Sequence, residues 1–159
     1  MKTIVPAFLF ALAVMFACGY RQSSVPIDAS SKLPECTVAA RASGNDIVVH
    51  VIVANHTTRP YRLLYWNLPK SGKMTSVLFQ ITRNGTPVEY RGIMMKREDR
   101  PTDFISIPPG RSFGTDIPLL AGYDVRPSGK YVIAYAAYNP SADSMGLDKL
   151  ISEPITLIK

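Results

Sequence analysis

The side chains with the most capacity for chemistry are two histidines, two cysteines and a pair of adjacent methionines. His50 and His56 stand on either side of an expected strand end, and the sequence has no HExxH motif, no Cys/His cluster with zinc-ligand spacing and no glycine-rich phosphate loop. Imidazole and thioether ligands suit Cu(I), so His50 with Met94 or Met95 is one copper hypothesis. We favour the simpler interpretation that His50 is a hydrogen-bonded strand residue and that the methionines pack. We therefore expect no bound metal.

The nucleophile motifs of hydrolases are also missing. No serine lies in a Gly-x-Ser-x-Gly elbow, and Cys36 has no histidine close to it in the sequence. We predict that the protein is not an enzyme, that it uses no cofactor and that it has no small-molecule substrate. Cys36 lies in an apolar, strand-like segment, and the favoured interpretation is a buried, unreactive thiol.

Residues 1–17 have the layout of a secretory signal peptide. A positive start is followed by an almost unbroken apolar run at 4–16, and Ala17 precedes Cys18. The run is too short for a membrane-spanning helix, which needs about 20 residues. The last two positions of the Met-Phe-Ala-Cys box resemble bacterial lipoprotein signals, which implies cleavage before Cys18 and lipidation of that cysteine. The alternative is a soluble secreted protein in which Cys18 is free or bridged to Cys36.

Residues 18–34 are rich in serine, proline and polar groups, so we expect the lipidated cysteine to be followed by a flexible tether. Gly19 is not acidic, which resembles lipoproteins that are sent to the bacterial outer membrane. We expect an extracytoplasmic protein, lipid-anchored through Cys18 on that membrane.

The 18 Lys and Arg outnumber the 12 Asp and Glu, giving a net charge of +6. Because the basic residues are scattered, we expect no nucleic-acid partner.

Residues 35–159 form a row of strand-like segments, which predicts one domain. Residues 46–54 are β-branched and apolar, and residues 77–83 are followed directly by Asn84-Gly85, the dipeptide typical of type I′ hairpin turns. Other strand-like runs occupy 36–40, 86–90, 102–107, 111–117, 130–138 and 151–158, and any helix is limited to a turn or two at 141–149. Seven to nine short strands predict an all-β, immunoglobulin-like antiparallel β-sandwich. Residues 123–131 resemble the tyrosine corner of that fold.

Without catalytic motifs, a compact exported β-sandwich most simply binds another protein through its loops or a free strand edge. Two segments, 63–69 and 90–97, combine the Tyr, Trp, Arg and Met side chains that anchor interfaces. The candidate partner-binding residues are Tyr90, Arg91, Met94, Lys96 and Arg97, with Trp66 and Asn67 adjacent. The alternatives are that Trp66 fills the core between the sheets and that residues 90–97 have structural roles.

Five segments in a fixed order carry a family pattern. They are NHTTRP at 55–60, LYWNLP at 64–69, LFQITRNGTPVEYRG at 78–92, DFISIPPG at 103–110 and YDV at 123–125. In this order they resemble the N-terminal pro-domain of bacterial deuterolysin-type (aspzincin) metalloendopeptidases. The likeness extends over residues 47–135, and Leu68 replaces the threonine of the family's Trp-x-Thr-Pro segment.

The resemblance implies a free-standing pro-domain-like module, without the zinc-binding HExxH peptidase domain of the family. Such domains fold beside the peptidase and hold it latent, so the expected partner is a secreted zinc metallopeptidase. The expected function is that of an inhibitor or folding helper of this peptidase. The alternative is a structural or assembly lipoprotein of the cell envelope. In that case the resemblance reflects a common ancestry of the fold and says nothing about a shared function. A third hypothesis, a copper or small-molecule carrier, predicts that the protein retains its ligand on purification.

Overall fold

The computed structural model describes residues 21–69, 72–142 and 145–159, so residues 1–17 and Cys18 lie outside the described part of the chain. The described chain is all-β, with three short 3-10 turns: η1 (Tyr65–Asn67), η2 (Pro101–Asp103) and η3 (Leu119–Ala121). Its strands are β1 (Arg21–Ser24), β2 (Glu35–Ser43), β3 (Asp46–Asn55), β4 (Tyr61–Leu64), β5 (Phe79–Arg83), β6 (Thr86–Pro87), β7 (Phe104–Ile107), β8 (Arg111–Pro118), β9 (Lys130–Pro140), β10 (Leu147–Ile151) and β11 (Ile155–Ile158).

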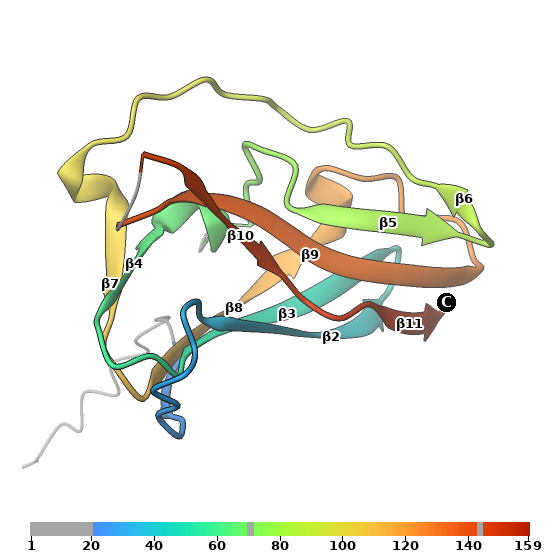
Figure 1. Ribbon diagram of the computed structural model, residues 1–159. Helices are drawn as coiled ribbons and strands as arrows, with labels where there is room; N and C mark the ends of the chain where they lie inside the picture. The colour runs from blue at the N-terminus through green and yellow to red at the C-terminus, as the bar shows by residue number, and fades with distance from the viewer. Residues whose placement is uncertain (1–20, 70–71, 143–144) are drawn as a thin grey trace, which may run out of the picture.

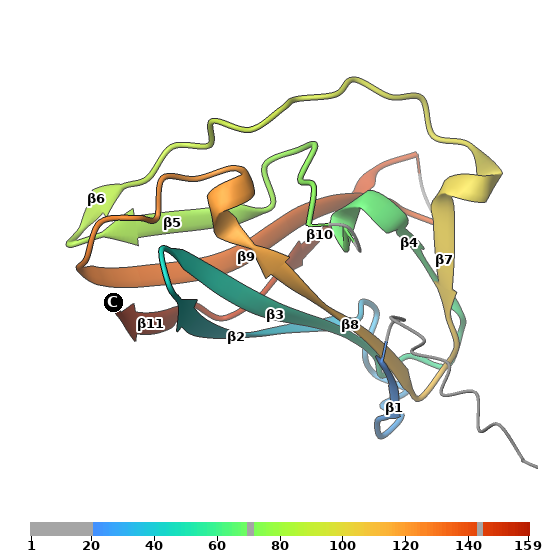
Figure 2. The same cartoon turned by 180° about the vertical axis from the view of Figure 1, so that it is seen from behind.

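Two antiparallel sheets form the layers of the molecule (Figures 1 and 2). One has the strand order β1-β8-β3-β2, and the other has the order β10-β9-β5-β6 with β11 also paired to β9. Strands β4 and β7 form a separate two-stranded sheet. Residues from both layers contribute to one hydrophobic core. The predicted antiparallel β-sandwich is confirmed.

The core follows from the two-residue period of the strands. Alternate side chains of β3 point inward and are fully buried, while those between them are half-buried: the inward set is Ile47, Val49, Val51 and Val53. Strand β9 faces them from the other layer with its own buried set, Tyr131, Ile133 and Tyr135. Each large buried side chain contributes about 1.5–3 kcal/mol relative to an exposed one, so these two strands supply much of the stability of the sandwich.

The predicted hairpin between β5 and β6 is confirmed. Asn84 and Gly85 have φ angles of 50° and 82°, the two positive values that a type I′ turn requires. The Asn84 side chain also accepts a hydrogen bond from the Lys130 amide at 2.9 Å, which ties the turn to the start of β9.

The end of the chain corrects two expectations. Residues 147–149 belong to β10, although the sequence pattern allowed a helical turn in this region. Within β10, Leu150 points into the core and its neighbours Lys149 and Ile151 face outward, the two-residue alternation of a strand. The expected single strand at 151–158 is divided in two at Ser152. The Ser152 hydroxyl accepts a hydrogen bond from the Tyr135 amide at 3.0 Å, so β10 and β11 pair with different halves of β9.

Two strands lie where the sequence pattern predicts none. Strand β4 is short, and β1 lies within the segment expected to be a tether. β1 pairs with β8 over its whole length, and the Val25 amide then donates to Gly110 O at 2.9 Å. The His56 ring donates from Nδ1 to Pro26 O at 2.7 Å. The chain therefore lies against the sandwich from Arg21 to Pro26.

A buried asparagine joins β9 to β4 across the edges of two sheets. The Asn139 side chain is fully buried, and its Oδ1 accepts a hydrogen bond from the Leu64 amide at 2.8 Å. Its Nδ2 donates to Arg62 O at 2.8 Å and to the Tyr61 hydroxyl at 3.1 Å. One side chain thus satisfies backbone groups on the edge of β4 that does not pair with β7.

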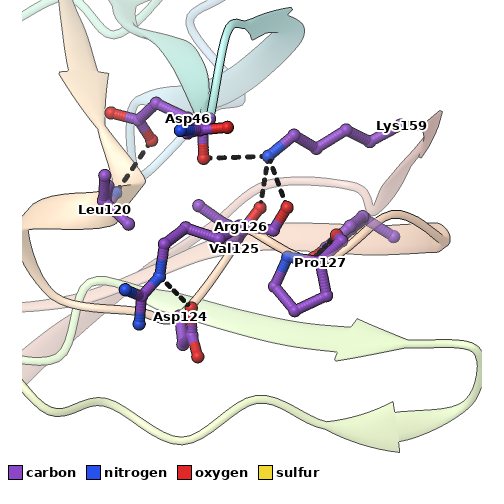
Figure 3. Close-up of polar contacts among 9 residues, drawn as sticks. Asp46, Leu120, Asp124, Val125, Arg126, Pro127 and Lys159 are labelled. Carbon is purple, nitrogen blue, oxygen red and sulfur yellow. Dashed lines mark hydrogen bonds and ion pairs between the residues drawn. The ribbon is translucent and has the colours of Figure 1, made fainter.

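A lysine closes the opposite end of the sandwich (Figure 3). The Lys159 ammonium donates to the carbonyl oxygens of Asn45, Val125 and Arg126 at 2.8, 2.6 and 3.2 Å. Beside it, the Asp46 carboxylate accepts from the Leu120 amide at 2.8 Å. These bonds connect the turn between β2 and β3, the end of β11 and the segment before β9.

Replacing Asn139 by Ala should destabilise the protein strongly. The change leaves the Leu64 amide and the Arg62 carbonyl without partners, and each unsatisfied buried group costs about 1–3 kcal/mol. We expect the free energy of unfolding in urea to fall by about 2–4 kcal/mol. The matched control is Gln80→Ala on the exposed side of β5, which should change it by about 0.5 kcal/mol or less. Equal effects of the two substitutions would contradict this role of Asn139.

The Cys36 thiol should be almost unreactive in the native protein. It is 5% exposed, and burial, helped by the nearby Glu35 carboxylate, raises its pKa to about 12. Because the thiolate is the reacting form, at pH 8 the native thiol should react with iodoacetamide roughly a thousandfold more slowly than an ordinary one. Mass analysis of the Cys36 peptide should show alkylation only after denaturation in guanidinium. Rapid labelling of the native protein would show that the thiol is accessible.

Candidate functional site

Residues 91–100 have no regular secondary structure and are called the strap. Figures 1 and 2 show the strap running from the β6 side to η2 along the outside of β5. Ile93, Met94 and Met95 expose 70%, 68% and 52% of their surface. Three consecutive exposed apolar residues are unusual on a protein surface and mark a candidate binding segment.

Tyr90 attaches the start of the strap to the body of the domain. Its hydroxyl lies 3.1 Å from Met74 O and 3.0 Å from Ile93 O, and it donates its proton to these two carbonyls. Its ring packs edge-to-face on Tyr123 at 5.3 Å between centroids. Burial raises the pKa of Tyr90, so the hydroxyl stays protonated near neutral pH and keeps its role as a donor.

Two glycines make room for the Tyr90 ring. A Cβ atom on Gly92 would overlap the Tyr90 hydroxyl, and one on Gly122 would overlap the ring edge. Neither glycine has a positive φ angle, so the requirement comes from close packing and not from backbone conformation. Glycine at both positions therefore keeps Tyr90 seated between the strap and η3.

A series of aromatic rings continues from Tyr90 into the core. Tyr123 packs on Phe79 and Phe79 packs on Tyr135, with centroid distances of 6.4 and 5.8 Å and edge-to-face geometry. The Tyr123 hydroxyl accepts from the Phe79 amide at 3.2 Å and donates to Phe79 O at 2.8 Å. Burial raises the pKa of Tyr123 to about 12, although its hydrogen bond to Phe79 opposes the change. The strap is thus connected to the most buried part of the domain.

A second set of hydrogen bonds positions η1. The Tyr135 hydroxyl donates to Asn67 O at 2.8 Å, and the Asn67 side chain donates to Tyr138 O at 2.9 Å. With Asn67 held inward, Tyr65 and Trp66 face outward and pack edge-to-face at 5.2 Å. The aromatic pair is therefore presented on the surface by buried polar contacts.

Between η1 and the strap lies an open, mainly apolar groove of about 900 Å³. Its walls come from η1, the loop before β5, the strap, the start of β7 and η3. The lining residues are Tyr65, Trp66, Pro69, Lys73, Met74, Thr75, Ile93, Met95, Arg97, Thr102, Phe104, Ile105 and Ala121. These described residues include no His, Cys, Asp or Glu, the side chains that most often act as acids, bases or metal ligands.

Arg97 joins the strap to the far wall of the groove. Its guanidinium lies 5.0 Å from the centroid of the Trp66 ring, in the arrangement of a cation–π contact, and it also contacts the Met95 sulfur at 3.1 Å. Lys73 is the second cation of the groove. The groove is therefore aromatic and methionine-rich, with a positive charge on either wall.

The structure brings most of the predicted binding residues to this region. Met94 and Lys96 are exposed on the strap, while Trp66 and Arg97 line the groove. The alternative that Trp66 fills the core is wrong, because this side chain is only partly buried and lies outside the core cluster. Arg91 is exposed but faces a separate hollow that it shares with Asp124.

Two predicted residues have their side chains engaged within the fold. Asn67 is 3% exposed, and the Tyr90 hydroxyl is bonded to two backbone carbonyls. Sequence reasoning missed the groove residues Tyr65, Met95 and Phe104. Tyr65 and Met95 lie inside the two predicted segments, 63–69 and 90–97, although neither was chosen as a candidate, whereas Phe104 lies outside both.

His50 is a paired strand residue, as expected. Its Nδ1 lies 2.6 Å from the Asp116 carboxylate, which also contacts Arg41 at 3.2 Å. Burial raises the Asp116 pKa, but the hydrogen bond from His50 and the Arg41 charge outweigh it, so the pKa falls below its usual value.

Across the described ranges, no group of three or more His, Cys, Asp or Glu residues is placed to bind a metal ion. The same part of the chain contains no helix long and apolar enough to span a bilayer.

Two proteases are similar in sequence to parts of this chain. No family model matches the sequence. An extracellular protease of Aeromonas hydrophila is 34% identical over 94 residues, which cover 58% of this chain and 27% of that protein. A protein of Arthroderma otae, described as a neutral protease 2 homologue, is 27% identical over 143 residues, covering 87% of this chain and 38% of that protein. The chain therefore spans less than two-fifths of either relative.

Among solved structures, YcdA of Bacillus subtilis, described as a candidate lipoprotein, aligns over 83% of this chain and 38% of its own, with a TM-score of 0.32 and 12% identity. A likeness this weak carries no conclusion about function. The sequence relationship to the two proteases is the informative result: over part of its length, this chain is distantly homologous to proteins of that kind.

Replacing Gly92 by Ala should loosen the strap. The new Cβ would displace the Tyr90 hydroxyl and break its two contacts, at a cost of about 1–2 kcal/mol for local opening. We expect trypsin to cut at Lys96 and Arg97 about 5–30 times faster, because cleavage follows the opened population. Tyr90→Phe should have a similar effect, and the control Thr37→Ala, an exposed position on β2 in the other sheet, should have none. Unchanged cleavage in both test variants would show that Tyr90 does not hold the strap.

Proposed function

We propose that this protein is an extracytoplasmic, lipid-anchored binding protein that acts on a secreted metallopeptidase as an inhibitor or folding helper. It would do so without catalytic chemistry of its own. The partner surface consists of the groove and the strap. The observation that carries the proposal is this exposed aromatic and methionine-rich surface, in a chain whose sequence is similar to parts of two proteases.

The extent of the sequence matches supports a domain with an accessory role. The similarity to the Arthroderma otae protein covers 87% of this chain but only 38% of that protein. A region of that size is comparable to the pro-domain that the sequence pattern resembles. A pro-domain binds its own peptidase, and a related domain on a separate chain retains the same possibility of binding in trans.

The composition of the groove supports protein binding. Tyr, Trp, Met and Arg are enriched in protein interfaces, and Tyr65, Trp66, Met95 and Arg97 all line the groove. A stable complex buries about 1,200–2,000 Å² in total, so the partner would need to cover the strap as well as the groove.

The position of β1 supports a defined orientation on the membrane. β1 begins at Arg21, three residues after the proposed lipid-bearing Cys18, and three residues reach at most about 11 Å. Figure 2 shows β1 at the opposite side of the domain from the strap. With a lipid on Cys18, the β1 side would lie at the membrane and the groove would face away from it.

A second exposed apolar surface favours the alternative role, an assembly lipoprotein of the envelope. Tyr138 of β9 and Leu147 and Ile151 of β10 expose 59%, 65% and 48% of their surface on neighbouring strands. An assembly partner would use this surface and leave the groove free.

The test is to titrate the exported protein into an active deuterolysin-type peptidase that has been freed of its own pro-domain. We expect peptidase activity on a fluorogenic peptide to fall to near zero at one equivalent. The double substitution Trp66→Ala and Met95→Ala should weaken inhibition about 30-fold, because a buried tryptophan anchor is worth about 2 kcal/mol.

The matched control is Leu147→Ala with Ile151→Ala, which removes the same kind of exposed apolar surface from β10. It should inhibit like the wild type, and circular dichroism should show that both variants are folded. No binding and no inhibition by the wild-type protein would overturn the proposal. Co-purification with envelope components that depends on Leu147 and Ile151 would establish the alternative.

A further inference from the structure

The strap presents an unpaired strand edge. In an extended chain, successive amide groups point to opposite sides. The Met95 amide donates inward to Thr75 O at 3.0 Å, so the amides of Met94 and Lys96 point away from the domain. Within the described residues, neither Met94 nor Lys96 has a backbone hydrogen bond. Their free N–H groups can therefore pair with a strand of another protein.

This edge is held in place on both sides. Toward the N-terminus, the Arg91 amide donates to Gly122 O at 2.7 Å, and Tyr90 holds Ile93 O at 3.0 Å. Toward the C-terminus, Arg97 packs on Trp66. The end of the strap is fixed at η2, where the Arg100 amide donates to the Asp103 carboxylate at 2.9 Å.

Because these contacts exist before binding, the strap has already lost much of its conformational freedom. Ordering a free residue costs about 1–2 kcal/mol in backbone entropy. A segment that is ordered in advance avoids this cost when it binds, and preorganisation of this kind is a general source of affinity. Both side chains are exposed: Ile93 lines the groove and Met94 does not, so each can supply an apolar contact to a bound partner.

The geometry points to one occupant for this edge: the substrate-binding cleft of the peptidase. We infer that residues 93–96 enter that cleft as an extended strand, in the manner of a substrate, with Met94 as the central side chain. Extended peptides bind to exposed sheet edges through main-chain hydrogen bonds, and pockets for alternate side chains provide specificity. The inference rests on the proposed function, because it specifies how the same surface contacts the peptidase.

The test uses proline to remove one amide donor from the strap. Met94→Pro deletes an N–H that has no partner within the described domain, so the fold should be kept. Asp99→Pro is the matched control, because it places the same residue in the strap beyond the Arg97–Trp66 contact. We expect Met94→Pro to weaken inhibition at least tenfold, which corresponds to about 1.4 kcal/mol, and Asp99→Pro to inhibit like the wild type.

Hydrogen exchange gives an independent measurement. In the free protein the amides of Met94 and Lys96 should exchange rapidly, and in the complex with the peptidase both should become protected. If the wild type inhibits while Met94→Pro inhibits equally well and these amides stay unprotected, the strap does not enter the cleft and the proposed function still stands. If the wild-type protein neither binds nor inhibits, the proposed function itself fails.

Discussion

The arrangement of this domain depends on one constraint: a phenol hydroxyl carried into the core by its ring must find a hydrogen-bond partner. Leaving such a group unsatisfied costs about 1–3 kcal/mol. Three tyrosine hydroxyls donate to backbone carbonyls of a loop or strand end: those of Tyr90, Tyr123 and Tyr135. These hydrogen bonds position the strap, the start of β5 and η1, respectively. Tyr131 does the same for the segment before β9, with its hydroxyl 2.6 Å from Pro127 O. The core therefore determines where the loops lie.

This constraint explains how an irregular segment is kept ready for binding. The strap makes few backbone hydrogen bonds, and a free segment of its length would lose several kcal/mol of entropy on being ordered. Tyr90 offsets that loss because its ring is fixed by Tyr123 and its hydroxyl by two carbonyls. The packing leaves no room for a Cβ at Gly92 or Gly122. The strap is thus held by the Tyr90 side chain and by the two glycines that make room for it, and not by hydrogen bonds between paired strands.

Local patterns were sufficient to predict the sandwich but not the site. The alternation in β3 and the Asn84-Gly85 turn are encoded within a few residues, and both are confirmed. The roles of Trp66, Asn67 and Tyr90 depend instead on which side of a short irregular segment faces the core. That choice is made by distant residues, such as Tyr135 bonding to Asn67 O. A sequence window identifies residues able to anchor a partner, but tertiary contacts decide which remain on the surface.

The chemistry of the groove constrains how binding would respond to solution conditions. Its described lining residues include no His, Cys, Asp or Glu, and burial raises the pKa of Tyr90, which holds the strap. Both histidines lie elsewhere: His50 pairs with Asp116, and His56 contacts Pro26 and Glu35. No histidine is among the described lining residues, so the usual source of a charge change between about pH 5 and 8 is not found there. Salt would weaken the binding of an acidic partner by screening Lys73 and Arg97.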